Sequence, residues 1–156
     1  MSNRDKRVFM SFQGEFINTV DVKGRASIPA RFREQLASIH EDERVVVTKR
    51  NGGLHAYPLS EWNKIRKGVE EMPPGTTRED ILRVMIAPAV ECGFDKQGRI
   101  QIPQSLRSYA DIEKDIVVVG LFNKIEIWSQ RRHAEVTRQS EARLDEARDV
   151  LAEVGF

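Results

Sequence analysis

The sequence predicts an α+β protein made of two pseudo-symmetric units, each a β-hairpin with short helices, followed by a C-terminal helix. Three observations support this prediction. A segment that begins at Asp21 recurs at Asp95, apolar residues alternate around both copies, and apolar residues return at heptad-like spacing after Gln130. The repeat defines where the other elements fall.

The repeat is thirteen residues long. The segments 21–33 (DVKGRASIPARFR) and 95–107 (DKQGRIQIPQSLR) are offset by 74 residues and share six identical positions, namely Asp, Gly, Ile, Pro and two Arg. Phe32 in the first copy corresponds to Leu106 in the second, so a large apolar side chain is kept there. A chance match of this kind is improbable, and the two halves of the chain therefore follow one plan.

Each half is expected to contain the same series of elements. Alternating apolar residues predict strands on both sides of the repeated glycine, and Pro29 and Pro103 suit the first turn of a short helix. Helices are also expected to begin near Ser60 and near Ser129. A hairpin is expected just before each of these helices, from strands at 45–48 with 54–57 and at 116–119 with 125–128.

The remaining helices are predicted from capping and spacing patterns. Thr76 with Glu79 has the pattern of a capping box, which predicts a linker helix that ends before Pro88. A C-terminal helix is expected from Gln130 to about Val154. The expected divisions of the chain are an N-terminal extension (1–11), a first hairpin domain (12–72), a linker helix (73–88), a second hairpin domain (89–133) and a C-terminal helical tail (134–156).

Composition excludes several classes of protein. The longest apolar runs are seven residues, whereas a membrane-spanning helix needs about 20. No signal peptide is recognisable, so we expect a cytoplasmic protein that does not contact a membrane. The single cysteine, Cys92, forms no internal disulfide and has no spaced partners for a metal site. The formal net charge of +1 means that any binding of nucleic acid must depend on local charge.

The repeated Asp-x-x-Gly-Arg pattern is the main candidate for a functional site. The aspartate can accept hydrogen bonds from backbone N–H groups just ahead, and the glycine can close a tight turn. One interpretation is structural, with Asp21 pairing with Arg25 or with Arg99 of the other copy. The other is functional, because rigid turns can present Arg25 and Arg99 to phosphates or to a guanine edge.

The candidate DNA-binding residues follow from this second interpretation. They are Asp21, Lys23, Arg25, Arg31, Asp95, Lys96 and Arg99. The first copy is the more basic one, since Arg31 aligns with Ser105 and Lys23 aligns with Gln97. We therefore expect the first copy to dominate binding.

An enzyme is the weakest alternative. The histidines His40, His55 and His133 are isolated in the sequence, and Cys92 lies in an apolar alternation typical of a buried thiol. Each copy of the motif has a single glycine, so no glycine-rich phosphate loop is present. We expect no catalytic residues, no metal and no cofactor.

Three segments carry a family resemblance, namely 14–29 (GEFINTVDVKGRASIP), 57–62 (YPLSEW) and 120–128 (GLFNKIEIW). Together they resemble the MraZ family over roughly residues 12–133. The family consists of bacterial transcriptional regulators with two tandem AbrB-like domains, usually encoded at the head of the division and cell-wall gene cluster. The resemblance implies two pseudo-symmetric AbrB/SpoVT-like β-hairpin domains in this chain.

The resemblance also implies a function. Asp21, Arg25, Asp95 and Arg99 would bind double-stranded promoter DNA, and closed homo-oligomeric rings would recognise direct repeats. It further implies a nucleoid-associated repressor of its own division and cell-wall gene cluster. The alternative is a ring-forming protein-interaction scaffold whose arginines pair across subunits. The two differ in whether Lys23, Arg25, Lys96 and Arg99 are free or each paired with a carboxylate.

Overall fold

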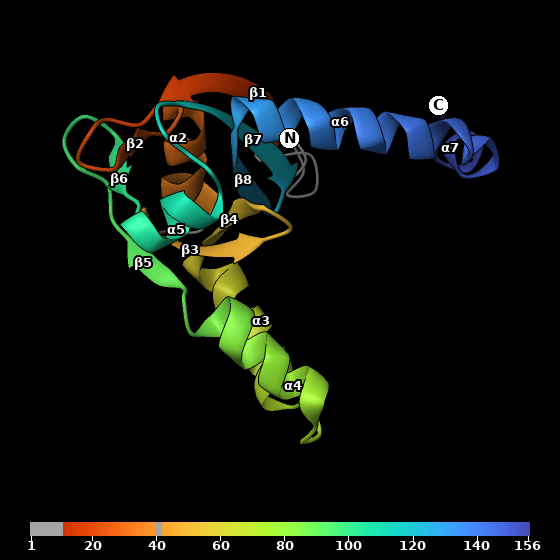
Figure 1. Ribbon diagram of the computed structural model, residues 1–156, viewed down its shortest axis with the longest axis horizontal. Coiled ribbons are helices and arrows are strands. Elements are labelled where there is room, and N and C mark those ends of the chain that lie inside the picture. Colours follow the sequence, from red (N-terminus) through yellow and green to blue (C-terminus); the bar gives the residue numbers. More distant parts are fainter. Residues whose placement is uncertain (1–10, 40–41) are drawn as a thin grey trace.

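A six-stranded antiparallel sheet forms the centre of the fold, and a two-stranded ribbon lies beside it (Figure 1). The computed structural model describes residues 11–39 and 42–156, so the expected N-terminal extension, apart from Ser11, lies outside the described residues. The strands are β1 (Phe12–Thr19), β2 (Arg25–Ser27), β3 (Val45–Arg50), β4 (Gly53–Pro58), β5 (Val90–Cys92), β6 (Arg99–Gln101), β7 (Asp115–Phe122) and β8 (Lys124–Ser129). The expected α+β class and both expected hairpins are confirmed.

The helices also occur in the predicted order. They are α2 (Ala30–Ile39), α3 (Leu59–Glu70), α4 (Thr76–Ile81), the π-helical turn η1 (Leu82–Ile86), α5 (Gln104–Tyr109), α6 (Gln130–Asp145) and α7 (Arg148–Val154). The two expected short helices, α2 and α5, are present, but they begin just after Pro29 and Pro103. Pro103 is the N-cap of α5 with a ψ of 149°, so it stands one place before the first turn in which the sequence placed it. None of the described helices combines the length and the apolar character needed to cross a bilayer.

The two halves of the chain exchange strands. Elements from β1 to η1 belong to the first half, and elements from β5 onwards belong to the second. The sheet order is β1-β7-β8-β4-β3-β5, so β1 pairs with β7 of the second half and β5 pairs with β3 of the first. The ribbon joins β2 to β6 in the same way. Both halves therefore contribute to one sheet.

One face of the sheet carries the main core. Apolar residues from alternate positions of the strands pack there with residues of α2, α5 and the ribbon. Phe32 and Leu36 of α2 and Leu106 of α5 are all buried, which matches the one-sided spacing of these residues in the sequence. On the opposite face, α3 and η1 contact β3, and the first turns of α6 contact β7 and β8.

The linker helix differs from the prediction at its start. Gly75 is the N-cap of α4, and Thr76 is already its first helical residue, so the Thr76 side chain makes no capping hydrogen bond. The backbone N–H of Glu79 donates to the carbonyl of Gly75 at 3.1 Å. The capping-box prediction is therefore wrong, because the turn at Gly75 starts the helix one residue early.

The C-terminal helix is also shorter than predicted. Ser129 caps α6 by accepting a hydrogen bond from the Arg132 N–H at 3.2 Å, but α6 ends at Asp145 and α7 begins after Ala147. Acidic Asp145 and Glu146 stand at this end of α6, where the helix dipole disfavours negative charge. The two helices project from the body as an arm (Figure 1), and neither has a buried residue.

Candidate nucleic-acid interface

The repeated motif forms two similar loops, loop 1 (residues 21–25) and loop 2 (residues 95–99). In loop 1, Asp21 Oδ1 accepts hydrogen bonds from the backbone N–H of Lys23 at 3.0 Å and of Arg25 at 2.9 Å. Gly24 has a φ of +87°, which a residue with a side chain rarely adopts. The predicted aspartate turn is thus confirmed in the first copy.

Loop 2 repeats this construction. Asp95 Oδ1 accepts from the backbone N–H of Gln97 at 2.9 Å and of Arg99 at 3.0 Å, and Gly98 has a φ of +75°. The two loops therefore share a backbone shape that the aspartate and glycine specify locally. The repeated motif is a turn with a fixed geometry in both halves.

Ion pairs join the two loops. Arg25 Nε donates to Asp21 Oδ2 at 2.6 Å, and Arg99 Nε donates to Asp95 Oδ2 at 3.0 Å. Arg99 also reaches Asp21 Oδ2 through Nη1 at 3.4 Å. Both pairings that the sequence left open are therefore present, one within loop 1 and one between the loops.

The same contacts affect the acidity of the two carboxyl groups. Hydrogen bonds from the backbone N–H and the guanidinium of Arg25 hold the pKa of Asp21 below its ordinary value. The corresponding groups of Arg99 lower the pKa of Asp95. Both aspartates are therefore ionised at neutral pH and can orient the arginines by charge-assisted hydrogen bonds.

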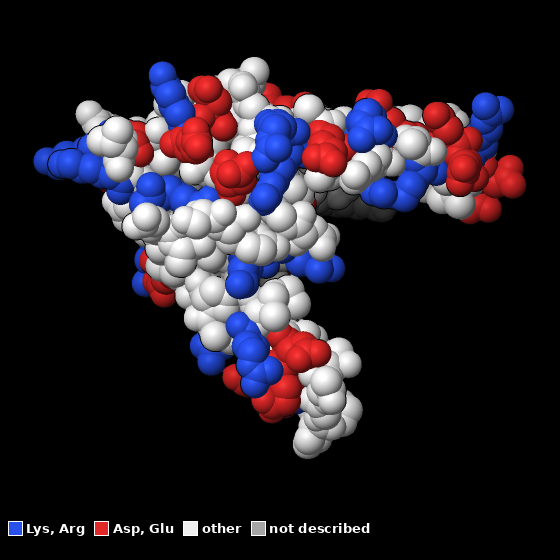
Figure 2. Space-filling model, in the orientation of Figure 1, with Lys and Arg blue, Asp and Glu red and all other residues white. Residues whose placement is uncertain are grey.

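The β2–β6 ribbon places the two loops at one end of the molecule. Ala26 pairs with Ile100 in the ribbon, and backbone hydrogen bonds run from Ile102 N–H to Gly24 O at 2.9 Å and from Ile28 N–H to Gly98 O at 3.2 Å. Lys and Arg side chains project at this end of the molecule, on the left in Figure 2. The ribbon therefore places loop 1 and loop 2 side by side on a surface that carries Lys and Arg side chains.

The two arginines are exposed to different degrees. The Arg25 side chain is 36% exposed and uses only Nε in hydrogen bonds within the described chain, so both of its terminal amino groups are available. The Arg99 side chain is 22% exposed and uses Nε and Nη1. Arg25 is therefore better placed than Arg99 to donate two hydrogen bonds to a ligand.

The other predicted site residues lie outside this ion-pair network. Lys23 and Lys96 are exposed on the two loops and form no ion pair with any residue that the structure describes. Arg31 is exposed on the first turn of α2. Arg25 and Arg99 are thus paired with carboxylates while Lys23 and Lys96 are not, a mixture of the two outcomes that the sequence left open.

Several residues of this region were not selected from the sequence. Val22 is 99% exposed in loop 1, and Gln101, Arg33 and Arg107 contact the loops from the ribbon and the short helices. The sequence did contain a pattern that could have selected Arg33 and Arg107, because they form the last identical pair of the repeat. Gln101 has no such signal, since Ser27 stands at the aligned position.

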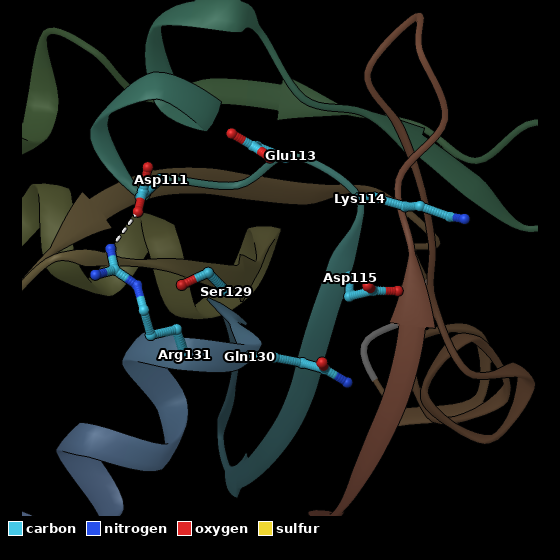
Figure 3. Close-up of a pocket in the computed structure, with 7 residues that line it drawn as sticks. All are labelled: Asp111, Glu113, Lys114, Asp115, Ser129, Gln130 and Arg131. Atoms are coloured by element: carbon cyan, nitrogen blue, oxygen red, sulfur yellow. Dashed lines mark hydrogen bonds and ion pairs between the residues drawn. The ribbon is translucent and has the colours of Figure 1, made fainter.

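A surface hollow lies away from the two loops. It has a volume of about 630 Å³ and contains none of the predicted site residues. Figure 3 shows its lining, in which Asp111 is turned towards Arg131 and forms an ion pair with it. Glu113 and Asp115 add two more carboxylates to the lining, which is unfavourable for a polyanion.

Two groups considered for catalysis have structural partners. His55 is buried, with Nε2 2.9 Å from Glu126 Oε2 and Nδ1 2.9 Å from the Tyr57 hydroxyl, so this histidine, isolated in the sequence, has two polar partners in the fold. His133 lies 3.5 Å from Glu15, whereas His40 is outside the described residues. Burial raises the pKa of the Cys92 thiol to about 11, which leaves it protonated and weakly nucleophilic.

The fold and the loops together define a class of protein, in which a duplicated chain presents two arginine-bearing turns on one strand-exchanged scaffold. Comparison with known families agrees with this description. The family model described as "MraZ protein, putative antitoxin-like" matches residues 11–83 and again 85–153. The chain belongs to the MraZ family of transcriptional regulators, and the resemblance found in the sequence is confirmed.

Individual relatives match over nearly the whole chain. A protein of Syntrophotalea carbinolica named "Transcriptional regulator MraZ" is 51% identical over 150 residues, which cover 94% of this chain and all of the relative. Proteins of the same name from Pediococcus pentosaceus and Geobacter sulfurreducens are 40% and 37% identical, each over 93% of this chain and 99% of the relative. The similarity therefore includes both loops and most of the C-terminal arm.

Proposed function

We propose that the chain regulates transcription by binding double-stranded promoter DNA through loops 1 and 2. The residues proposed to act are Asp21, Lys23, Arg25, Arg31, Asp95, Lys96 and Arg99. Arg25 and Arg99 contact base edges or phosphates, the aspartates orient them, and the lysines and Arg31 neutralise phosphates. The regulated promoter is that of the chain's own division and cell-wall gene cluster, which it represses.

The observation that carries this proposal is the orientation of Arg25. Asp21 holds Arg25 through Nε, which leaves the two terminal amino groups as a fork. A guanine presents two acceptors in the major groove, and an arginine fork matches both. The major groove also admits a two-stranded ribbon of the kind formed by β2 and β6.

We further propose that the chains form a closed ring. Two non-identical halves in one chain allow the second half of one subunit to contact the first half of the next, and such head-to-tail contacts form a ring when the rotation between subunits closes. Subunits related by rotation present loop 1 in the same sense to successive stretches of DNA. The operator is therefore a series of direct repeats about one helical turn apart, roughly 10 to 10.5 base pairs.

The test is the affinity for duplexes from the region upstream of the chain's own gene. Duplexes with one, two and three repeats are compared, together with a two-repeat duplex that carries a five-base-pair insertion. We expect affinity to rise with each repeat, since linked sites raise the effective concentration, and to fall on insertion. Equal affinity for one and three repeats, or no effect of the insertion, contradicts the mechanism.

A second function is kept as an alternative because Arg25 and Arg99 both contact carboxylates of their own chain, as arginines with a structural role would. In this alternative the arginines serve a ring-forming scaffold and pair across subunits without touching DNA. Native mass spectrometry of wild type and of Arg25→Ala distinguishes the two proposals. Loss of the oligomer in Arg25→Ala favours the scaffold, whereas an intact oligomer without DNA binding favours the regulator.

A further inference from the structure

Loop 1 is held by side chains from the other half of the chain. Gln101 of β6 stands opposite Arg25 in the ribbon, and its Nε2 donates to the backbone carbonyl of Lys23 at 2.6 Å. This bond fixes the carbonyl at the centre of the turn. The Gln101 side chain thus spans the ribbon and fastens the loop that carries Lys23 and Arg25.

Arg107 of α5 supports the same loop from another direction. A Cβ atom at Gly24 would lie 2.8 Å from Cζ and from Nε of Arg107, so the guanidinium is in close contact with the Gly24 backbone. Arg107 Nε donates to the Ile102 carbonyl at 3.0 Å, and the Ile102 N–H donates to the Gly24 carbonyl at 2.9 Å. Arg107 is therefore fixed to the residue that is itself bonded to loop 1.

Loop 2 receives fewer contacts of this kind. Arg33 of α2 packs against Gly98, where a Cβ atom would lie 2.6 Å from its Cζ. The position aligned with Gln101 holds Ser27, and within the described chain the Asp95 carboxylate accepts only from its own loop. Asp21, in contrast, also accepts from Arg99. The pseudo-symmetry is broken in favour of loop 1.

We propose that the second half of the chain positions loop 1 for binding, with Gln101 and Arg107 as positioning residues. This inference rests on the proposed DNA-binding function, and it assigns different roles to the two halves. Loop 1 supplies most of the contacts that recognise DNA, and loop 2 adds to them. The ribbon and α5 of the second half hold loop 1 in the shape that makes those contacts.

The test compares Gln101→Ala with Gln139→Ala. Gln139 is exposed on α6 and makes no side-chain hydrogen bond within the described chain, so it is a matched control. Neither change alters the charge. Hydrogen exchange of the loop 1 amides is measured on the free protein, and duplex affinity is measured over a range of salt concentrations.

We expect loop 1 amides to exchange about fivefold faster in Gln101→Ala, which corresponds to the loss of one ordinary hydrogen bond. Affinity should fall by a similar factor for each loop engaged, with no change in the log–log salt slope, because no phosphate contact is lost. Arg107→Lys keeps the charge but lacks the planar guanidinium, and it should have the same effect. Gln139→Ala should behave as wild type.

The other outcomes overturn the inference. Faster exchange with unchanged affinity means that the shape of loop 1 does not matter for binding. Unchanged exchange with reduced affinity means that Gln101 touches DNA directly. If the wild-type chain binds no duplex, the proposed function fails. Equal exchange of the loop 1 amides in Gln101→Ala and in wild type would then show, separately, that Gln101 does not hold loop 1 in place.

Discussion

Replacing Arg25 by alanine should abolish sequence-specific DNA binding and leave the fold intact. The two free amino groups of Arg25 can form a bidentate contact, which contributes about 1–3 kcal/mol of discrimination per base. When two subunits engage two repeats, the combined loss is about 2–6 kcal/mol, or roughly 30-fold to 20,000-fold in affinity. Arg99 has one unused amino group in the described chain, so Arg99→Ala should cost less.

The assay is fluorescence anisotropy with a two-repeat duplex and a scrambled duplex of equal length. Arg138→Ala is the matched control, because Arg138 is exposed on α6 and has no ion pair within the described chain. Arg25→Lys keeps the charge without the fork, so it should retain the affinity for the scrambled duplex and lose the preference for the repeats. Discrimination that survives in Arg25→Ala refutes the proposed role of Asp21 and Arg25.

Three further predictions concern the protein without DNA. Gly24→Ala should lower the free energy of unfolding by at least about 1–2 kcal/mol, because φ is +87° there and a Cβ atom would lie 2.8 Å from the Arg107 guanidinium. Gly68→Ala, in the last turn of α3 where a Cβ atom would meet nothing, should raise it by up to about 1 kcal/mol; urea unfolding of both variants checks this. Cys92 should react slowly with a thiol reagent at pH 8 in the folded chain and rapidly after unfolding, since burial raises its pKa to about 11. NMR titration of Asp21 and Asp95 should give pKa values below 3.8, the ordinary value for an aspartate. The two carboxylates then stabilise the folded chain fully above that pH, and this stabilisation is lost as the pH falls through the lowered pKa values. A titration midpoint above 3.8 contradicts the loop geometry.

The sequence predicted the loops well because their shape is local. An aspartate that accepts from the N–H groups two and four residues ahead and a glycine with positive φ lie within five residues, and the motif itself predicts both features. The order of the hairpins and short helices could be predicted from the sequence for the same reason. Each depends on a proline, a turn or an alternation within a short stretch of chain.

The exchange of strands could not be predicted in this way. Alternation in β1 shows which side chains face the core, but it does not select β7, about one hundred residues later, as the partner. The contact between Asp21 and Arg99 was left open for the same reason. Gln101 was missed because its role depends on lying opposite Arg25 in the ribbon, and the break after Asp145 was missed because the heptad-like spacing continues through it.

Strand exchange changes how variants of this chain must be interpreted. Loop 1 lies between β1 and β2, whose partners β7 and β6 belong to the second half, while loop 2 lies between β5 and β6, whose partners β3 and β2 belong to the first. A substitution in one half therefore acts on the loop of the other half as well as on its own.

Arg99 illustrates the consequence. Arg99→Ala removes a potential DNA contact, but it also removes a donor from Asp21 and so loosens the orientation of Arg25. Asp95→Asn weakens the support of Arg99 within loop 2 and leaves every donor to Asp21 in place. If Arg99 acts on DNA directly, the two variants lose affinity together. If Arg99 acts through Asp21, only Arg99→Ala lowers the affinity for DNA, and loop 2 then acts by orienting Asp21 and Arg25 of loop 1.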